Sequence, residues 1–198
     1  MKRFFAYALE REVMIMKKAA VFFGTGYEEI EALTVVDLLR RVGIETVCVA
    51  IDNESYVTGS HNICVAMDTG IDMLDFDCFD ILVCPGGMPG TKKLEACTKL
   101  TEQLHKFYEN GKLIAAICAA PSIFGHMGLL KGKKACIYPG METELSEAEV
   151  CFDKVVKSGN IITSRGMGTA IAFSLEIIAS LLNQETANDL AEKIVYTK

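Results

Sequence analysis

The sequence lacks the cysteine patterns that mark metal sites and redox dithiols. None of its eight cysteines forms a Cys-x-x-Cys pair, and none stands with a histidine at the spacing of a zinc finger. We therefore expect no metal site. Eight thiols without a pairing pattern suit a reducing compartment, so we predict a cytoplasmic protein.

The sequence also lacks basic runs and long apolar runs. The formal net charge is −6, and no basic run is longer than Lys-Gly-Lys-Lys at 131–134, whereas nucleic-acid affinity depends on Lys and Arg. No apolar run approaches the ~20 residues that span a bilayer. The apolar run near the N-terminus has about six residues, fewer than the ~7–15 of a signal peptide. We predict no stable nucleic-acid complex and no membrane partner.

The length and composition predict one globular domain. A chain of 198 residues with 51% hydrophobic residues can build one large core but is short for two domains. The domain is assigned to residues 17–198. Residues 1–16 precede it as an N-terminal appendage, for which a short helix and a disordered segment both stay open.

The first part of the domain has the pattern of a β-α-β unit. Apolar, β-branched stretches at 19–23 and 46–51 predict strands, and an apolar stripe over 28–42 predicts a helix that Gly43 ends. Such a unit implies parallel strands. The turn Gly24-Thr25-Gly26 does not complete a dinucleotide fingerprint, because the third glycine position holds Glu29, whose carboxylate would repel a pyrophosphate.

The remaining pattern alternates strands and helices. Strands are predicted at 62–67, 81–84, 113–117, 134–137, 154–157 and 161–164, and helices at 99–110, 121–127, 168–182 and 185–196. This alternation indicates an α/β fold with a mostly parallel central sheet. Pro85-Gly86-Gly87 follows one strand at the end where ligands bind in such sheets, although a simple tight turn stays open there.

Cys118 lies between a buried strand and a helix. It directly follows the apolar run 113–117, and Pro121, which suits the first turn of a helix, comes three residues later. Backbone N–H groups and the positive end of the helix dipole would favour a thiolate there. This arrangement resembles a nucleophile elbow. Free cysteines are more often small core residues, so a reactive and a structural Cys118 both stay open on position alone.

A carboxylate is a better proton partner for Cys118 than the histidines. His105 lies among polar helix residues, His126 is too far along the helix, and His61 is undecided. The acids Glu28, Glu29 and Glu31 follow the first strand, whose end we expect beside the end of strand 113–117. Desolvation on the apolar stripe would raise the pKa of one of them. Helical spacing allows both Glu28 and Glu31 and cannot choose between them.

Five motifs in order resemble a known superfamily. They are Gly-Tyr-Glu-Glu-Ile-Glu-Ala (26–32), Asp-Leu-Leu-Arg-Arg-Val-Gly-Ile (37–44), Pro-Gly-Gly (85–87), Ala-Ala-Ile-Cys-Ala-Ala-Pro (115–121) and Thr-Ser-Arg-Gly-Met-Gly-Thr-Ala (163–170). The chain from about Lys18 is similar to the ThiJ/PfpI superfamily (class I glutamine amidotransferase-like), and within it to the short branch that holds the Parkinson-associated protein deglycase and bacterial YajL. Residues 1–16 have no counterpart.

The resemblance implies a flavodoxin-like three-layer α/β/α sandwich, a homodimer and a cofactor-free site. It implies Cys118 as an easily oxidised nucleophile and Glu31 as the protonated acid beside it, with the backbone N–H groups of Gly87 and Ala119 as oxyanion donors. The implied activities are glyoxalase and deglycase chemistry on α-oxoaldehydes or their early adducts, together with redox-sensing and chaperone-like roles. The implied substrates are small carbonyl compounds or glycated proteins and nucleotides.

The sequence departs from the branch at two positions. Tyr138 stands where many members carry an active-site histidine, and Ala119 stands where the protease-like branch has a histidine, which argues against peptidase activity. Arg41 matches an arginine near the dimer-side pocket, and another pocket arginine is replaced around His61. We count Gly86, Tyr138, Arg41 and His61 as candidate pocket residues.

Two functional hypotheses follow. The first is a glyoxalase or deglycase, with a role in oxidative or carbonyl stress, in which the Cys118 thiolate adds to an aldehyde and Glu31 moves the proton. The second is a non-enzymatic redox sensor or chaperone in which Cys118 is oxidised to a sulfinate that Glu31 stabilises. The sequence does not identify the physiological carbonyl substrate.

Overall fold

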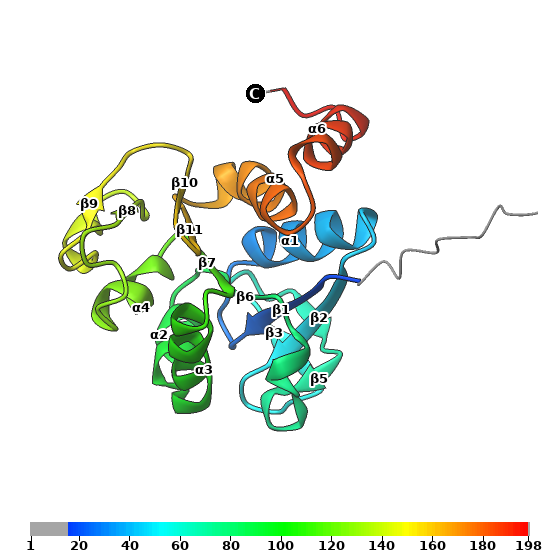
Figure 1. The fold of residues 1–198 in the computed structure, drawn as a ribbon. Coiled ribbons are helices and arrows are strands. Elements are labelled where there is room, and N and C mark those ends of the chain that lie inside the picture. Colours follow the sequence, from blue (N-terminus) through cyan, green and yellow to red (C-terminus); the bar gives the residue numbers. More distant parts are fainter. Residues whose placement is uncertain (1–15, 198) are drawn as a thin grey trace, which may run out of the picture.

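A computed structural model describes residues 16–197 of the chain, so the predicted appendage lies outside the described residues except for Met16. The centre is a seven-stranded sheet in the order β10-β11-β7-β6-β1-β2-β5 (Figure 1). All neighbouring strands are parallel except β10 and β11. The bounds are β1 (Lys18–Phe23), β2 (Glu45–Ala50), β5 (Thr69–Gly70), β6 (Ile81–Cys84), β7 (Leu113–Ile117), β10 (Val155–Ser158) and β11 (Ile161–Ser164).

The strand order confirms the predicted fold class. If the five long parallel strands β1, β2, β6, β7 and β11 are counted in chain order, they run 2-1-3-4-5 across the sheet, which is the flavodoxin-like order. Strands β1, β6 and β7 are apolar along nearly their whole length because helices cover both faces of the sheet.

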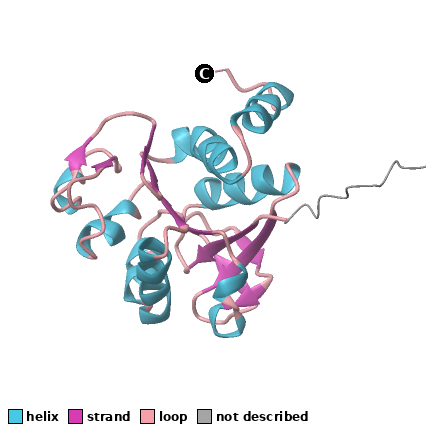
Figure 2. Ribbon diagram, in the orientation of Figure 1, coloured by secondary structure: helices cyan, strands magenta, loops and turns pink. Residues whose placement is uncertain are grey.

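Helices form an outer layer on each face of the sheet (Figure 2). One face packs against α1 (Glu29–Arg41), α5 (Ala170–Leu181) and α6 (Gln184–Lys193), through residues such as Val35, Phe173 and Leu190. The other face packs against α2 (Gly90–Ala96), α3 (Thr98–Glu109) and α4 (Pro121–His126), through residues such as Leu94 and Leu104. The result is the predicted α/β/α sandwich. No helix among residues 16–197 combines the length and apolar character needed to cross a bilayer.

Several short elements differ from the prediction. The strand predicted at 62–67 is one arm of a separate antiparallel hairpin, β3 (Tyr56–Thr58) with β4 (Cys64–Ala66). Helix α2 was not predicted, because its start follows a glycine- and proline-rich turn. The strand predicted at 134–137 is reduced to β8 (Lys134–Ala135), which pairs with β9 (Glu149–Val150) in a separate small sheet. The remaining short elements are the 3₁₀ turns η1 (Ile71–Met73), η2 (Phe76–Cys78), η3 (Glu142–Glu144) and η4 (Met167–Thr169).

The expectation that the ends of β1 and β7 lie side by side is wrong. Strand β6 lies between them and pairs with both, so the ends of β1 and β7 are not adjacent. The loop that follows β6, with Gly86 and Gly87, therefore stands between the start of α1 and the elbow at Cys118. This intervening loop supplies backbone groups to the candidate site.

Candidate active site

The candidate site is a cavity of about 510 Å³ at the carboxyl ends of the central strands. This is the edge of an open α/β sheet where ligands bind. The lining residues come from the start of α1, the β3–β4 connection, the loops after β6 and β7, and the segments around β10 and β11. They are Glu28, Glu31, His61, Gly87, Cys118, Tyr138, Pro139, Phe152, Lys154, Arg165, Gly166, Met167, Gly168 and Thr169.

Cys118 forms the predicted elbow between β7 and α4. Its φ of 64° lies in the left-handed region, which costs a residue with a side chain roughly 1–2 kcal/mol. The backbone is held there because the N–H of Cys118 donates to the carbonyl of Ser164 and its carbonyl accepts from the N–H of Tyr138, both at 2.9 Å. The backbone N–H groups of Ala119 and Gly87 lie near its sulfur and act to lower the pKa of the thiol. These are the two groups predicted as oxyanion donors.

Gly86 fits between Cys118 and Glu31 because it has no side chain. A Cβ at this position would lie 2.6 Å from the Cβ of Cys118 and 2.6 Å from Oε2 of Glu31, closer than real Cβ contacts come. The N–H of Gly86 donates to that Oε2 at 2.9 Å. The glycine-rich loop is thus more than a tight turn, because it positions the carboxyl group beside the sulfur.

Glu31 lies on α1 and is 1% exposed. Its carboxyl group accepts the backbone N–H of Gly86, and Cys118 and the backbone N–H of Met167 lie near enough to act on its pKa. Burial is the largest influence and raises the pKa of Glu31 to about 7, although these hydrogen bonds oppose it. A protonated Glu31 is therefore available near neutrality.

The thiol of Cys118 does not follow the expectation of a simple thiolate. Burial, and then the charge and hydrogen bond of Glu31, raise the pKa of Cys118 to about 12. Helix α4 has only six residues, and its start does not outweigh these influences. Because the influence of Glu31 requires its ionised form, the two groups titrate together. From about pH 7 upward, the pair holds one proton that either group can carry.

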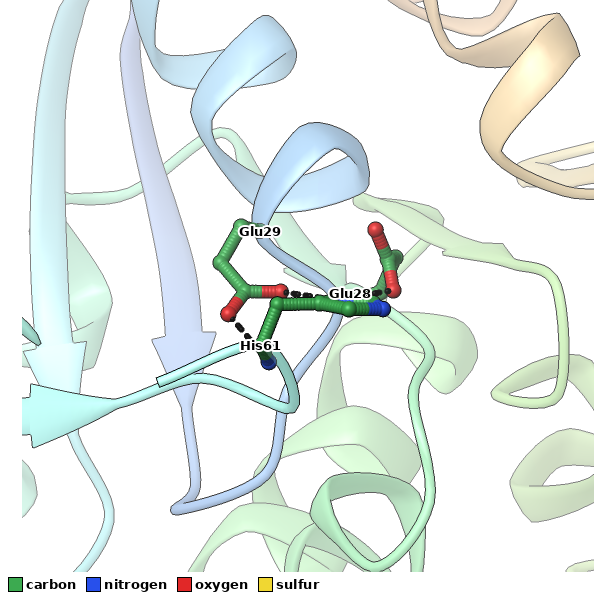
Figure 3. A group of neighbouring side chains, drawn as sticks. All are labelled: Glu28, Glu29 and His61. Atoms are coloured by element: carbon green, nitrogen blue, oxygen red, sulfur yellow. Dashed lines mark hydrogen bonds and ion pairs between the residues drawn. The ribbon is translucent and has the colours of Figure 1, made fainter. Parts of the chain in front are cut away.

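A second group of side chains consists of Glu28, Glu29 and His61 (Figure 3), of which Glu28 and His61 line the same cavity. Nδ1 of His61 lies 2.9 Å from Oε2 of Glu29 and 3.6 Å from Oε2 of Glu28, and the hydroxyl of Ser60 lies 3.2 Å from both carboxylates. Burial alone would raise the pKa of Glu29, but the hydrogen bonds from His61 and Ser60 lower it to about 2. Glu29 is therefore a buried carboxylate, 3% exposed, that stays ionised.

The same three side chains have the spacing of metal ligands. One ligand atom from each of Glu28, Glu29 and His61 lies within 4.8 Å of the others. The hydrogen-bonded ion pair between His61 and Glu29 accounts for this arrangement without a metal ion.

The other candidate residues have separate positions. Tyr138 lines the cavity and is 50% exposed. Arg41 is not part of this cavity: it lies in the last turn of α1, roughly 15 Å from Glu31 by helical rise, and pairs with Asp37. His126 lies on α4 between the carboxylates of Glu95 and Glu144, and His105 lies on α3 beside Glu109, both exposed.

Sequence reasoning missed one wall of the cavity. Arg165 and Lys154 bring two cations to it, and the guanidinium of Arg165 lies 5.5 Å from the ring centre of Phe152. The available signal was the position of Arg165 directly after β11, because β11 pairs with β7, the strand that ends directly before Cys118. Met167, 52% exposed, completes a partly apolar rim.

Comparison with known proteins gives one consistent set of similarities. The model of the DJ-1/PfpI family matches residues 17–180. Protein dj-1beta of Drosophila melanogaster is 35% identical over 181 residues, which cover 90% of this chain and 97% of that protein. The glutathione-independent glyoxalase DJR-1.2 of Caenorhabditis elegans is 32% identical over 173 residues, which cover 86% of this chain and 91% of that protein.

A solved structure described as Toxoplasma gondii DJ-1, oxidized, has the same architecture. It superposes with a TM-score of 0.88 at 36% identity and covers 92% of this chain and 100% of that one. Two matched relatives are longer: the chain spans about two fifths of the length of the DJ-1 homologs A and B of Arabidopsis thaliana, 42% and 41%.

Proposed function

Because the chain belongs to the DJ-1/PfpI family, we propose that it is a cysteine-dependent, cofactor-free glyoxalase or deglycase acting on α-oxoaldehydes or their early adducts. The observation that carries the proposal is the buried Glu31 carboxyl group beside Cys118, held there by the N–H of Gly86. A nucleophile needs an adjacent group that accepts and returns protons, and this pair contains both parts.

The first step uses the shared proton. The sulfur of Cys118 bonds to the aldehyde carbon of the substrate, and the aldehyde oxygen takes the proton that Glu31 carries. The products are a hemithioacetal and an ionised Glu31. The N–H groups of Gly87 and Ala119, which lie near the sulfur, are the donors that would stabilise the negative charge developing on this oxygen.

The second step is an isomerisation that needs no external oxidant. The carboxylate of Glu31 removes the hydrogen on the sulfur-bearing carbon and returns it to the neighbouring carbonyl carbon, while the carbonyl oxygen gains a proton and the hemithioacetal hydroxyl loses one. A thioester of a 2-hydroxy acid results. Water then cleaves the thioester, so methylglyoxal plus water gives lactate and the free Cys118 thiol.

The size of the cavity favours adducts as well as free dicarbonyls. A volume of about 510 Å³ is ordinary for a pocket that binds a small organic ligand, and it is larger than a three-carbon aldehyde needs. Early adducts of α-oxoaldehydes with amines or thiols carry the same reacting carbons with a larger substituent. The partly apolar rim of Tyr138, Phe152 and Met167 can contact such a substituent.

Lactate formation from methylglyoxal tests the proposal. We expect the wild type to produce lactate, Cys118→Ser to produce none above the uncatalysed rate, and Cys64→Ser to match the wild type. Cys64 is a suitable control because it is an exposed free cysteine on β4, outside this cavity. Absence of lactate with the wild type, or equal rates with Cys118→Ser, would rule the proposal out.

One relative supports a second candidate, an oxidation sensor. The Toxoplasma gondii structure is described as oxidized, and in this chain a sulfinate at Cys118 would meet the N–H groups of Gly87 and Ala119 and a protonatable Glu31. The wild type, Cys118→Ser and Cys64→Ser also distinguish these two candidate functions. A sensor would show selective gain of oxygen at Cys118 under mild peroxide, by mass spectrometry, together with no lactate formation.

A further inference from the structure

Glu29 and His61 form a carboxylate–imidazole pair with two hydrogen bonds. Oε1 of Glu29 accepts the backbone N–H of His61 at 2.7 Å, and Oε2 lies 2.9 Å from Nδ1 of the same residue (Figure 3). An ionised carboxylate can only accept, so Nδ1 carries the hydrogen. These contacts fix both the backbone and the ring of His61, and they explain why a charged Glu29 is stable at 3% exposure.

The second ring nitrogen of His61, Nε2, takes no part in these hydrogen bonds. Within residues 16–197, Nε2 has no hydrogen-bond partner, and the side chain is 68% exposed. His61 lines the cavity that contains Cys118 and Glu31. Because both residues line this one cavity of about 510 Å³, a substrate bonded to the sulfur of Cys118 shares its space with the imidazole of His61.

The charges around His61 favour its protonated form. Glu29 and Glu28 from the start of α1 face it most closely, and Ser60 is its chain neighbour. Elsewhere in the cavity are the Cys118–Glu31 pair and the cations Lys154 and Arg165. The hydrogen bond to Glu29, followed by the charge of Glu28, raises the pKa of His61. The other two histidines of the chain lie outside this cavity.

We propose that His61 is a catalytic residue of this site, whose Nε2 protonates the keto oxygen of the substrate, and that Glu29 is the residue that positions it. The inference rests on the proposed function, because it assigns the group that transfers protons to and from the substrate oxygens, while Glu31 transfers protons to and from the carbons. Such an arrangement, with a buried carboxylate on Nδ1 and a free Nε2, is the one in which an imidazole is held in a single orientation for proton transfer.

The proton transfers balance over the isomerisation. As Glu31 takes the hydrogen from the sulfur-bearing carbon, Nε2–H of His61 gives its proton to the keto oxygen, and an enediol forms. The enediol hydroxyl on the sulfur-bearing carbon then returns a proton to Nε2, and Glu31 gives its proton to the neighbouring carbon. A cis-enediol has both oxygens on one side, so a single nitrogen can serve both.

The test is the pH dependence of kcat and KM for lactate formation in four proteins. For the wild type, we expect the rate to rise through about pH 7 as the Cys118–Glu31 pair loses its first proton and to fall again as His61 loses its own. In His61→Gln, kcat should drop by about 10²-fold with little change in KM, and the alkaline fall should disappear. The matched control His105→Gln, on exposed α3, should keep the wild-type profile.

Glu29→Gln tests the positioning role. It keeps an acceptor for Nδ1 but loses the charge, so the alkaline fall should move to lower pH, toward the ordinary pKa of histidine of about 6.5. If Glu29→Gln does not fold, Glu28→Gln gives the same shift to a smaller extent, because its oxygen is farther away at 3.6 Å. If Glu29 had a purely structural role, Glu29→Gln would lower stability without moving the alkaline fall of the pH profile.

Three outcomes would overturn the inference. A His61→Gln enzyme with wild-type kcat, or with an unchanged alkaline fall, removes His61 from the chemistry while the proposed function stands. Loss of wild-type activity with a chelator, restored by Zn²⁺, assigns the cluster to a metal instead. Absence of lactate from the wild type refutes the proposed function, and this role with it.

Discussion

Replacing Glu31 with glutamine should stabilise the folded protein, and the gain should grow with pH. The folded-state pKa of Glu31 is raised to about 7 from an ordinary value of 4.5, so the folded protein holds this proton more tightly than the unfolded chain. The favourable contribution of the protonated carboxyl is fully present below pH 4.5 and is lost as the pH rises through 7. Glutamine has no proton to lose and keeps an oxygen for the N–H of Gly86.

The magnitude follows from the two pKa values. Linkage gives a destabilisation by Glu31 of about 1 kcal/mol at pH 5 and about 3 kcal/mol at pH 8, so the advantage of Glu31→Gln should increase by roughly 2.5 kcal/mol between them. With a urea m-value of about 2 kcal/mol/M, the difference between the two unfolding midpoints should widen by about 1 M.

The assay is urea unfolding of both proteins at pH 5 and pH 8, at one protein concentration. Glu102→Gln is the matched control, since Glu102 is an exposed glutamate on α3 without an ion pair among the described residues. The effect of Glu102→Gln on the unfolding midpoint should be small at both pH values. If the advantage of Glu31→Gln were the same at both pH values, Glu31 would not have a raised pKa, and its part in the shared proton would be refuted.

Three further predictions concern other parts of the structure. Gly86→Ala should fold, but its rate of lactate formation should fall at least about 10²-fold, because the new Cβ would push apart Cys118 and Glu31. Wild-type activity of this variant would contradict the close packing of Gly86 between the two residues. Tyr27→Phe should raise the free energy of unfolding by about 1 kcal/mol in urea titrations, because the buried Tyr27 hydroxyl has no partner among the described residues; a loss would show that it has one. His126→Gln should lower the free energy of unfolding at pH 6, by less than about 1 kcal/mol for this partly exposed group, but not at pH 9. The reason is that its two carboxylate partners raise the pKa of His126, and their stabilisation is lost above that pKa; an equal effect at both pH values would exclude the ion pairs.

The sequence predicts the parts of the fold that depend on local signals. The bounds of β7 and the start of α4 were predicted correctly, because an apolar run, a proline and a glycine mark them directly. The hairpin of β3 and β4 was only half predicted, since strands of three residues give too little alternation to recognise. Helix α2 was missed because its first residue, Gly90, continues a turn-like sequence.

The site depends more on contacts between distant segments. Helical periodicity could not separate Glu28 from Glu31, because both lie beside the apolar stripe of α1; the contact of Glu31 with Gly86, 55 positions away, distinguishes them. His61 could not be placed from its neighbours in sequence, because its loop joins two strands outside the main sheet. Only the folded chain brings that loop to the start of α1, 32 positions earlier.

The start of α1 shows how one helical turn can supply two acids with opposite behaviour. Glu29 and Glu31 are both almost fully buried, yet the pKa of Glu29 is lowered to about 2 and that of Glu31 is raised to about 7. Two residues of helix correspond to a rotation of about 200°, so the side chains leave the helix on opposite sides. Glu29 meets the donors of His61 and Ser60, which stabilise its charge, whereas Glu31 meets a sulfur and the backbone. A permanently charged acid that holds an imidazole and a protonatable acid that serves a thiol are the two kinds of group that proton transfer at neutral pH requires.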